Sequence, residues 1–386
     1  MGDYNFKLRL KIALIIVLVS PFFGADPSVS RQGQTKMLGV NRPGIAWVKS
    51  DQSWQNTIDD MAGQNVQALR LAMLPPFSHT LDIIQYAKSK GMQVLVIVPL
   101  TQNIYYPKDN VSREPSREFP EIRRLSRLDV EMVDKYWSDI FLECEKRKIY
   151  IDAIQVGNEI NSAQFNGDLP ILSSGRIVRA ADGIDEQTWS DFKLGMRRVV
   201  ESTLVIKKAI TASDLKVRPK ILSGSLVLQD ENWISKSGNV TVDPSLALKL
   251  MLGYNVGEYV DIYSIHIYPY FKPFMNIDNF QEDVRRQIDG LMLPLLALTN
   301  DEKSWWVTEW GISSRVKTKP NVDRKSLYCR YLAALDKSGA NSYVSATFIY
   351  DWDENPTFDI WDGRRVLNSE DSIFASGSGS NCSISP

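Results

Sequence analysis

Two short apolar segments of the sequence each end on a glutamate, and this pairing indicates acid–base chemistry. Residues 151–156 have the β-branched, apolar character of a strand that is buried on both faces, and they lead into Gly157-Asn158-Glu159. Residues 304–308 repeat this pattern and lead into Glu309. A buried carboxylate is costly unless it is paired or used. A strand that simply reaches solvent would explain one such glutamate, whereas two suggest the carboxyl pair that cleaves glycosidic bonds.

The elements that must position these glutamates follow an alternating order. Strand-like runs are predicted at 37–47, 66–73, 92–99, 150–159, 220–228, 260–268, 304–309 and 343–351. Helical patterns are predicted at 53–64, 80–91, 129–147, 188–212, 278–298 and 325–335. An open, doubly wound sheet is the alternative, but residues 39–44 do not form the phosphate-binding glycine loop that usually follows its first strand. We therefore predict an α/β protein with a single (β/α)8 TIM barrel over residues 36–370.

In such a barrel the carboxyl ends of the strands converge on one face, so residues that end different strands become neighbours. The long connections 100–128 and 161–187 follow the third and fourth strands, and we expect them to form the walls of a cleft on this face. The residues at or near predicted strand ends that could act there are Arg70, Asn158, Glu159, His266, Tyr268, Glu309 and Trp352.

This set of residues resembles the glycoside hydrolases of clan A, a superfamily of barrel enzymes that includes families 5, 39 and 53. The resemblance depends on residues 156–159, 308–311 and 266–268, and it covers most of residues 37–365 without singling out one family. It implies a retaining β-glycosidase in which Glu159 is the general acid/base and Glu309 is the nucleophile.

The resemblance also implies substrate-binding roles for five residues. Asn158 would bind the 2-hydroxyl of the sugar, and Tyr268 would contact the nucleophile. Arg70 would lie beneath the nucleophile, or alternatively form only a salt bridge at the end of the barrel. His266 would orient the site, or alternatively be a core residue. Trp352 would form the floor of the subsite.

Other aromatic residues have two interpretations each. Tyr105 and Tyr106, in the connection after the third strand, could stack on sugars or simply cover the rim. Trp305 and Trp306 should alternate between the barrel interior and the helix layer, so at most one can approach the site. Trp361 is expected to have a packing role.

Composition and charge exclude several classes of protein. The hydrophobic content of 44% and charged content of 24% are typical of a soluble globular protein. A net charge of −1 gives no electrostatic reason to expect nucleic acid or an anionic membrane as a partner. The two histidines and three cysteines show no metal-ligand spacing, and no nucleotide-binding loop is present. We expect neither metal nor cofactor, and the partner that the resemblance implies is a β-linked oligo- or polysaccharide.

The N-terminal segment predicts export. Lys7, Arg9 and Lys11 precede the apolar run 12–19, which is short for a membrane span and suits a signal peptide. We expect residues 1–25 to be a signal peptide or an N-terminal anchor, and the protein to be secreted or periplasmic.

The cysteines and the C-terminal composition give two further predictions. Three cysteines do not indicate a disulfide scaffold, and Cys144 and Cys329 are expected to be buried as small apolar residues. The Ser/Gly-rich residues 373–386 predict a flexible tail.

Together these observations predict an exported, retaining β-glycoside hydrolase that acts within polysaccharide chains. Two alternatives stay open. One is a carbohydrate-binding barrel that has lost turnover, and the other is a transglycosylase that uses the same two carboxyl groups. Which β-linked polymer is the substrate does not follow from the sequence, because specificity depends on loop geometry.

Overall fold

The computed structural model describes residues 36–47, 51–108, 112–113, 121–269, 277–300, 303–314, 323–367, 373–374 and 382. The predicted export segment 1–25 lies outside these residues, and so does most of the predicted tail.

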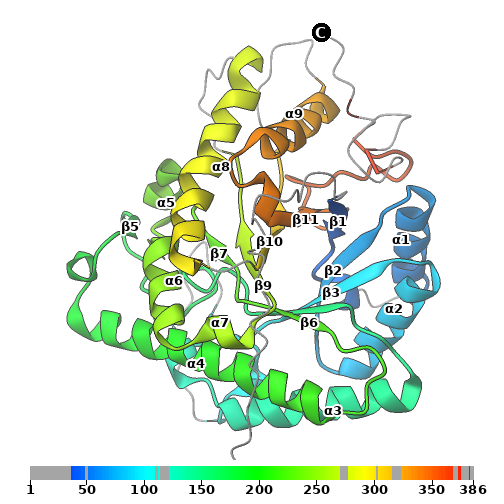
Figure 1. Ribbon diagram of the computed structural model, residues 1–386, viewed down its shortest axis with the longest axis horizontal. Helices are drawn as coiled ribbons and strands as arrows, with labels where there is room; N and C mark the ends of the chain where they lie inside the picture. The colour runs from blue at the N-terminus through cyan, green and yellow to red at the C-terminus, as the bar shows by residue number, and fades with distance from the viewer. Residues whose placement is uncertain are drawn as a thin grey trace, which may run out of the picture. The chain divides into compact units, whose positions relative to one another are not determined.

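Eight parallel strands close into a barrel, which confirms the predicted (β/α)8 fold (Figure 1). In their order around the barrel they are β1 (Met37–Asn41), β2 (Ala68–Ala72), β3 (Gln93–Val98), β4 (Ala153–Val156), β6 (Lys220–Leu222), β9 (Ile262–His266), β10 (Ser304–Trp310) and β11 (Val344–Ile349). The pairing of β11 with β1 completes the ring. A short strand, β7 (Leu226–Val227), pairs with β9 just beyond β6, so the fifth barrel strand is interrupted at residues 223–225.

The barrel interior is filled by alternate residues of its strands. One buried cluster takes at least one side chain from each of seven strands, and these are Ala68, Leu95, Ala153, Leu222, Ile262, Trp306, Ala346 and Phe348. Only a position inside the ring brings all of them together. Trp305 points the other way and stacks on Tyr263 with ring centroids 5.0 Å apart. The predicted alternation of Trp305 and Trp306 is therefore confirmed.

Seven longer helices accompany the strands, and they are α1 (Asp51–Gly63), α2 (Phe77–Ser89), α3 (Val130–Arg147), α4 (Glu186–Ala212), α6 (Pro244–Gly253), α8 (Ile277–Thr299) and α9 (Arg324–Lys337). Helix α3 shows how the sequence specifies such a helix. Asp129 caps it by accepting hydrogen bonds from the N–H groups of Glu131 and Met132. Its buried residues, which include Val133, Trp137 and Ile140, recur at the spacing of one helix face. Helices α3 and α4 lie side by side (Figure 1).

The sequence patterns missed several short elements between residues 161 and 260. These are the small parallel sheet of β5 (Arg176–Val178) and β8 (Val240–Val242), together with α5 (Glu231–Ser237), α6 and α7 (Val256–Tyr259). Strands of three residues are too short to establish a period. The β5–β8 pairing joins the connection after β4 to the one after β7, and both lie on the face where the strands end.

The connections after β3 and β4 also contact each other. The buried carboxylate of Asp168 accepts hydrogen bonds from the N–H group of Ser126 at 2.9 Å and from its hydroxyl at 2.6 Å. Tyr105 and Tyr106 are buried in the first of these connections, so neither offers a ring face to a sugar. Of their two interpretations, covering the rim is the one that agrees with the structure.

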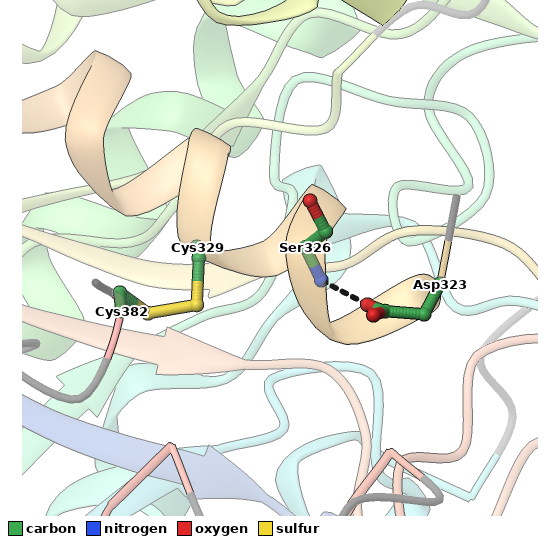
Figure 2. Close-up of a disulfide and its surroundings, with 4 residues drawn as sticks. All are labelled: Asp323, Ser326, Cys329 and Cys382. Atoms are coloured by element: carbon green, nitrogen blue, oxygen red, sulfur yellow. Dashed lines mark hydrogen bonds between the residues drawn. A yellow bond between two sulfur atoms is a disulfide. The ribbon is translucent and has the colours of Figure 1, made fainter. Parts of the chain in front are cut away.

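A disulfide joins Cys329 of α9 to Cys382, near the capped start of the helix at Asp323 and Ser326 (Figure 2). Cys329 is buried, as predicted, but its disulfide was not predicted, because Cys382 comes from a segment with no periodic pattern. Cys144 is free and buried, as predicted. Within the predicted flexible tail, Ile373 and Phe374 are also buried, so the described residues of this segment are anchored to the barrel unit.

Within the part of the chain that the structure describes, every helix is too short or too polar to span a bilayer.

Candidate active site

A tight turn at the end of β4 presents Glu159. Gly157 has φ of 100° and Glu159 has φ of 43°, a left-handed value that is uncommon for a residue other than glycine. Position 157 has no room for a side chain, because a Cβ there would lie 2.7 Å from Ile160 Cγ2. Ser225, in the interruption between β6 and β7, holds the turn by accepting the Glu159 N–H on its Oγ at 2.9 Å. This hydrogen bond to the segment between β6 and β7 thus helps to hold the unusual backbone conformation of Glu159.

A register shift in β10 presents Glu309. Along the pairing with β9, Val307 is opposite Ile265 and Glu309 is opposite His266, so Thr308 is an extra residue. The following residue, Trp310, stacks on Tyr331 of α9 with ring centroids 3.9 Å apart. The helix layer therefore holds Trp310 on one side, while Glu309 faces the barrel mouth.

Arg70 is the centre of the hydrogen-bond network between these strands. It is fully buried on β2, and its Nη1 donates to Glu309 Oε2 at 2.8 Å and to Asn41 Oδ1 at 2.6 Å. Its Nη2 donates to Asn158 Oδ1 at 2.7 Å, and its Nε donates to Gln155 Oε1 at 3.2 Å. The guanidinium thus both forms the ion pair and positions the residue beside Glu159. Arg70 does form a salt bridge, but its further hydrogen bonds to Asn41, Asn158 and Gln155 show that the salt bridge is not its only contact.

Both oxygens of Glu309 accept hydrogen bonds. Oε2 receives the Arg70 guanidinium, and Oε1 receives the hydroxyl of Tyr268 in a close contact. Burial raises the pKa of Glu309 above its ordinary value, and the Arg70 guanidinium and the Tyr268 hydroxyl offset only part of this rise. The predicted contact of Tyr268 with Glu309 is present. Both partners favour the ionised form of this carboxyl group.

Glu159 has no cation as a hydrogen-bond partner. Its Oε1 lies 2.9 Å from Nδ1 of His266, and Nε2 of the same ring lies 3.4 Å from the Arg70 guanidinium. Since a guanidinium can only donate, Nε2 must be the acceptor, and we assign the ring proton to Nδ1. Burial, followed by the Arg70 charge, keeps the pKa of His266 well below its usual value. A neutral imidazole therefore donates to Glu159.

The two carboxyl groups are close and differ in proton affinity. One oxygen of Glu159 lies within 4.8 Å of one oxygen of Glu309. Burial raises the pKa of Glu159 well above its usual value, and the negative charge of Glu309 raises it further. Arg70 contacts Glu309 directly and lowers the pKa of Glu159 only through space. The site can therefore hold a protonated Glu159 beside an ionised Glu309.

Glu159, His266 and Glu309 also carry atoms that could bind a metal ion. Among the described residues, Glu159, His266 and Glu309 form the one group whose ligand atoms all lie within 4.8 Å of one another. The Arg70 guanidinium already donates to Glu309 and contacts His266. A second cation would have to compete with this buried positive charge. The donor set therefore fits proton transfer better than metal binding.

Trp352 lies just after β11 and packs against another tryptophan. Its ring is fully buried, and it stacks on Trp361 with centroids 5.0 Å apart and an interplanar angle of 17°. A ring that floors a subsite needs an exposed face, and the structure gives Trp352 none, so this role stays a prediction. By contrast, Trp47 is 63% exposed in the short helix η1 (Ile45–Trp47), which follows β1 on the face where the strands end.

Sequence reasoning missed four polar residues that support the two glutamates, namely Asn41, Gln155, Ser225 and Gln229. Asn41 had a usable signal, because it ends β1 as a polar residue after an apolar run. Gln155 also had one, since it is a polar residue in an otherwise apolar strand. Ser225 and Gln229 had none, because Ser225 lies in an interruption of the fifth strand that no pattern indicates, and Gln229 follows it.

The fold and these side chains define a (β/α)8 barrel with two opposed carboxyl groups at the carboxyl ends of β4 and β10. A β-glucosidase from Thermotoga maritima has a similar structure, with a TM-score of 0.54 and 10% identity, over 91% of this chain and 99% of that one. The endo-1,4-β-D-mannanase from Thermotoga petrophila is also similar, with a TM-score of 0.50 and 14% identity, over 90% and 98%. At such identities the similarity shows the fold alone. No family model matches the sequence, and no curated protein matches it either.

Proposed function

We propose that this protein is an exported, retaining β-glycoside hydrolase in which Glu309 is the nucleophile and Glu159 is the general acid/base. The observation that carries the proposal is the pair of carboxyl groups itself. Their oxygens come within 4.8 Å, near the roughly 5–5.5 Å separation of retaining enzymes and below the roughly 6.5–9.5 Å of inverting ones. Their surroundings support different roles, because Glu309 is paired with the Arg70 guanidinium and suits the ionised nucleophile, whereas Glu159 is not paired with a cation among the described residues and suits the acid.

In the first step the ionised Glu309 attacks the anomeric carbon of the bound sugar. The bond from that carbon to the leaving oxygen breaks, and Glu159 transfers its proton to this oxygen. Arg70 and Tyr268 hold the attacking carboxylate in place. Asn158, whose Oδ1 accepts from Arg70, keeps its amide nitrogen available for the sugar 2-hydroxyl.

In the second step water releases the sugar from the Glu309 ester. Esterification removes the negative charge of Glu309, which is one of the two causes that raise the pKa of Glu159. The pKa of Glu159 therefore falls after the first step, and Glu159 can take a proton from the attacking water. Each group returns to its starting state when the bond between Glu309 and the sugar is cleaved.

A polymeric substrate and an exported location complete the proposal. The long connections after β3 and β4, together with the exposed ring of Trp47, offer surface for sugar units beyond the cleaved bond. The Cys329–Cys382 disulfide is consistent with an oxidising compartment, where such bonds persist. Both features support an enzyme that acts on polysaccharide outside the cytoplasm.

The test is release of reducing ends from a panel of β-linked polysaccharides by the wild type, Glu159→Gln and Glu309→Gln. We expect cleavage of at least one polymer, a β-configured first product by proton NMR, and loss of activity in both variants. Binding of a polymer without cleavage would favour a carbohydrate-binding barrel. Products longer than the substrate would favour a transglycosylase. Activity that survives Glu309→Gln would overturn the assignment of the nucleophile.

A further inference from the structure

Gln229, in the connection after β7, is anchored by three donors on its carbonyl oxygen. Oε1 accepts from Asn239 Nδ2 at 2.6 Å, from Thr241 Oγ1 at 3.0 Å and from Ser162 Oγ at 3.4 Å. Asn239 and Thr241 are fully buried, at the start of β8 and within it. Ser162 comes from the connection after β4. The amide is thus fixed by two different connections.

This anchoring determines which end of the amide faces Glu159. Because Oε1 is an acceptor for its anchoring donors, the amide nitrogen must point the opposite way. Nε2 donates to Glu159 Oε2 at 3.4 Å and to Gln164 Oε1 at 3.3 Å. Glu159 therefore receives one donor on each oxygen, from His266 at 2.9 Å on Oε1 and from Gln229 on Oε2.

We propose that Gln229 is a positioning residue for Glu159, which holds Oε2 toward the substrate and stabilises the carboxylate when Glu159 acts as the base. This inference rests on the proposed function. The oxygen with the longer and weaker donor contact is Oε2, so the transferred proton resides there. The Gln229 amide then accommodates both states, because a protonated Oε2 can still accept a weak hydrogen bond and an ionised Oε2 accepts a stronger one.

Several other groups set the proton affinity of Glu159. The charge of Glu309 on β10 raises its pKa and the charge of Arg70 on β2 lowers it, while His266 of β9 and Tyr268 just after β9 are the other titratable groups beside the pair. Gln229 is neutral, so replacing it with an apolar residue changes no charge in the site. A donor to the carboxylate favours the ionised form, and its removal must raise the pKa of Glu159.

The experiment compares Gln229→Met with Gln164→Met as the matched control. Gln164 accepts from the same amide nitrogen, and its hydrogen bonds among the described residues do not include one to Glu159. We expect Gln229→Met to move the alkaline limb of the kcat/KM profile upward by about 0.5 pH unit and to lower the rate of the second step several-fold. Gln164→Met should leave the alkaline limb in place.

A second readout separates this inference from the proposed function. The carboxyl carbons of ¹³C-labelled glutamate are titrated by NMR, and Glu159 is identified by the resonance that Glu159→Gln removes. Gln229→Met should raise the titration midpoint of this resonance even if no polysaccharide is cleaved. An unchanged midpoint would overturn the role of Gln229. Should Gln229→Met fail to fold, Thr241→Val removes one anchor of Oε1 and should shift the midpoint in the same direction by a smaller amount.

Discussion

Glu159 and Glu309 lie in the same barrel mouth, yet their surroundings differ in charge. Glu309 accepts from a guanidinium and a phenol, both of which favour its ionised form. Glu159 accepts from a neutral imidazole and an amide, and its side of the site contains no directly bonded cation. Both groups are more than nine-tenths buried, so exposure does not separate them. Hydrogen-bond partners, more than burial, therefore give these two identical side chains different roles.

The largest effect should come from removing each carboxyl group in turn. We expect Glu309→Ala and Glu159→Ala each to lower kcat/KM by about 10⁴-fold or more on a natural substrate. With an activated aryl β-glycoside and azide, Glu309→Ala should give the α-glycosyl azide, because azide attacks the substrate directly. Glu159→Ala should give the β-glycosyl azide, because azide attacks the ester of Glu309. Proton NMR of the anomeric position distinguishes the two products.

An exposed glutamate provides the control for this comparison. Glu282 forms ion pairs with Arg285 and Arg286 on the surface of α8, and Glu282→Ala should keep full activity without azide. If both active-site variants gave the same anomer, the division of roles between Glu159 and Glu309 would be wrong.

A smaller but more selective effect should follow from Arg70→Met. Arg70 lowers the pKa of Glu309, so its loss should raise that pKa and move the acidic limb of the kcat/KM profile to higher pH. Activity at the optimum should fall by about 10²–10³-fold, because the carboxylate also loses its orienting donor. The free energy of unfolding should drop by about 3–5 kcal/mol, since the buried Glu309 loses its partner.

The matched control is Arg286→Met, which removes an arginine from an exposed pair with Glu282. Exposed pairs contribute little to stability, so both the pH profile and the free energy of unfolding should match those of the wild type. An acidic limb that stays in place in Arg70→Met would show that another group keeps Glu309 ionised.

The fold and the positions of the two glutamates were predictable because the strands and helices have periodic apolar patterns and both glutamates lie at strand ends. Apolar runs of strand length alternate with amphipathic helical runs, and the carboxyl ends of such strands must converge. The residues that distinguish Glu159 from Glu309 were harder to find. Arg70 is a charged residue within the apolar strand β2, and Tyr268 follows β9. Ser225 lies in the interruption between β6 and β7, and Gln229 follows it, and only the three-dimensional pairing of β6, β7 and β9 reveals this interruption.

Two packing contacts did not follow from the sequence, for related reasons. Trp352 was placed in the subsite from its position after the eighth strand, but its stacking on Trp361 depends on the path of the chain beyond residue 352. Cys329 was expected to be a buried apolar residue, and its disulfide was not predicted because its partner Cys382 lies 53 residues away in a segment without a pattern. Contacts made by irregular segments do not follow from local periodicity, because no repeating spacing fixes where these segments lie.

The smallest effect, and the most direct measure of the protonated state, is the pH dependence of stability in Glu159→Gln. The pKa of Glu159 is raised in the folded protein, whereas a glutamate in the unfolded chain has a pKa of about 4.3. Between these values the folded state binds the extra proton, so Glu159 lowers the free energy of unfolding by about 1.4 kcal/mol for each pH unit of increase. His266 acts in the opposite direction, because it is neutral when folded and protonated when unfolded below about pH 6.5.

In the wild type these two slopes oppose each other over the pH range above about 4.3 in which Glu159 keeps its proton in the folded protein. Glu159→Gln removes only the first, so its free energy of unfolding, measured by urea denaturation, should rise with pH relative to the wild type throughout this window. In the control variant Glu131→Gln, an exposed change at the start of α3, the free energy of unfolding should depend on pH as it does in the wild type. If the pH dependence of Glu159→Gln also matched that of the wild type, Glu159 would be ionised in the folded protein. The contrast with Glu309 would then have to come from geometry rather than from proton affinity.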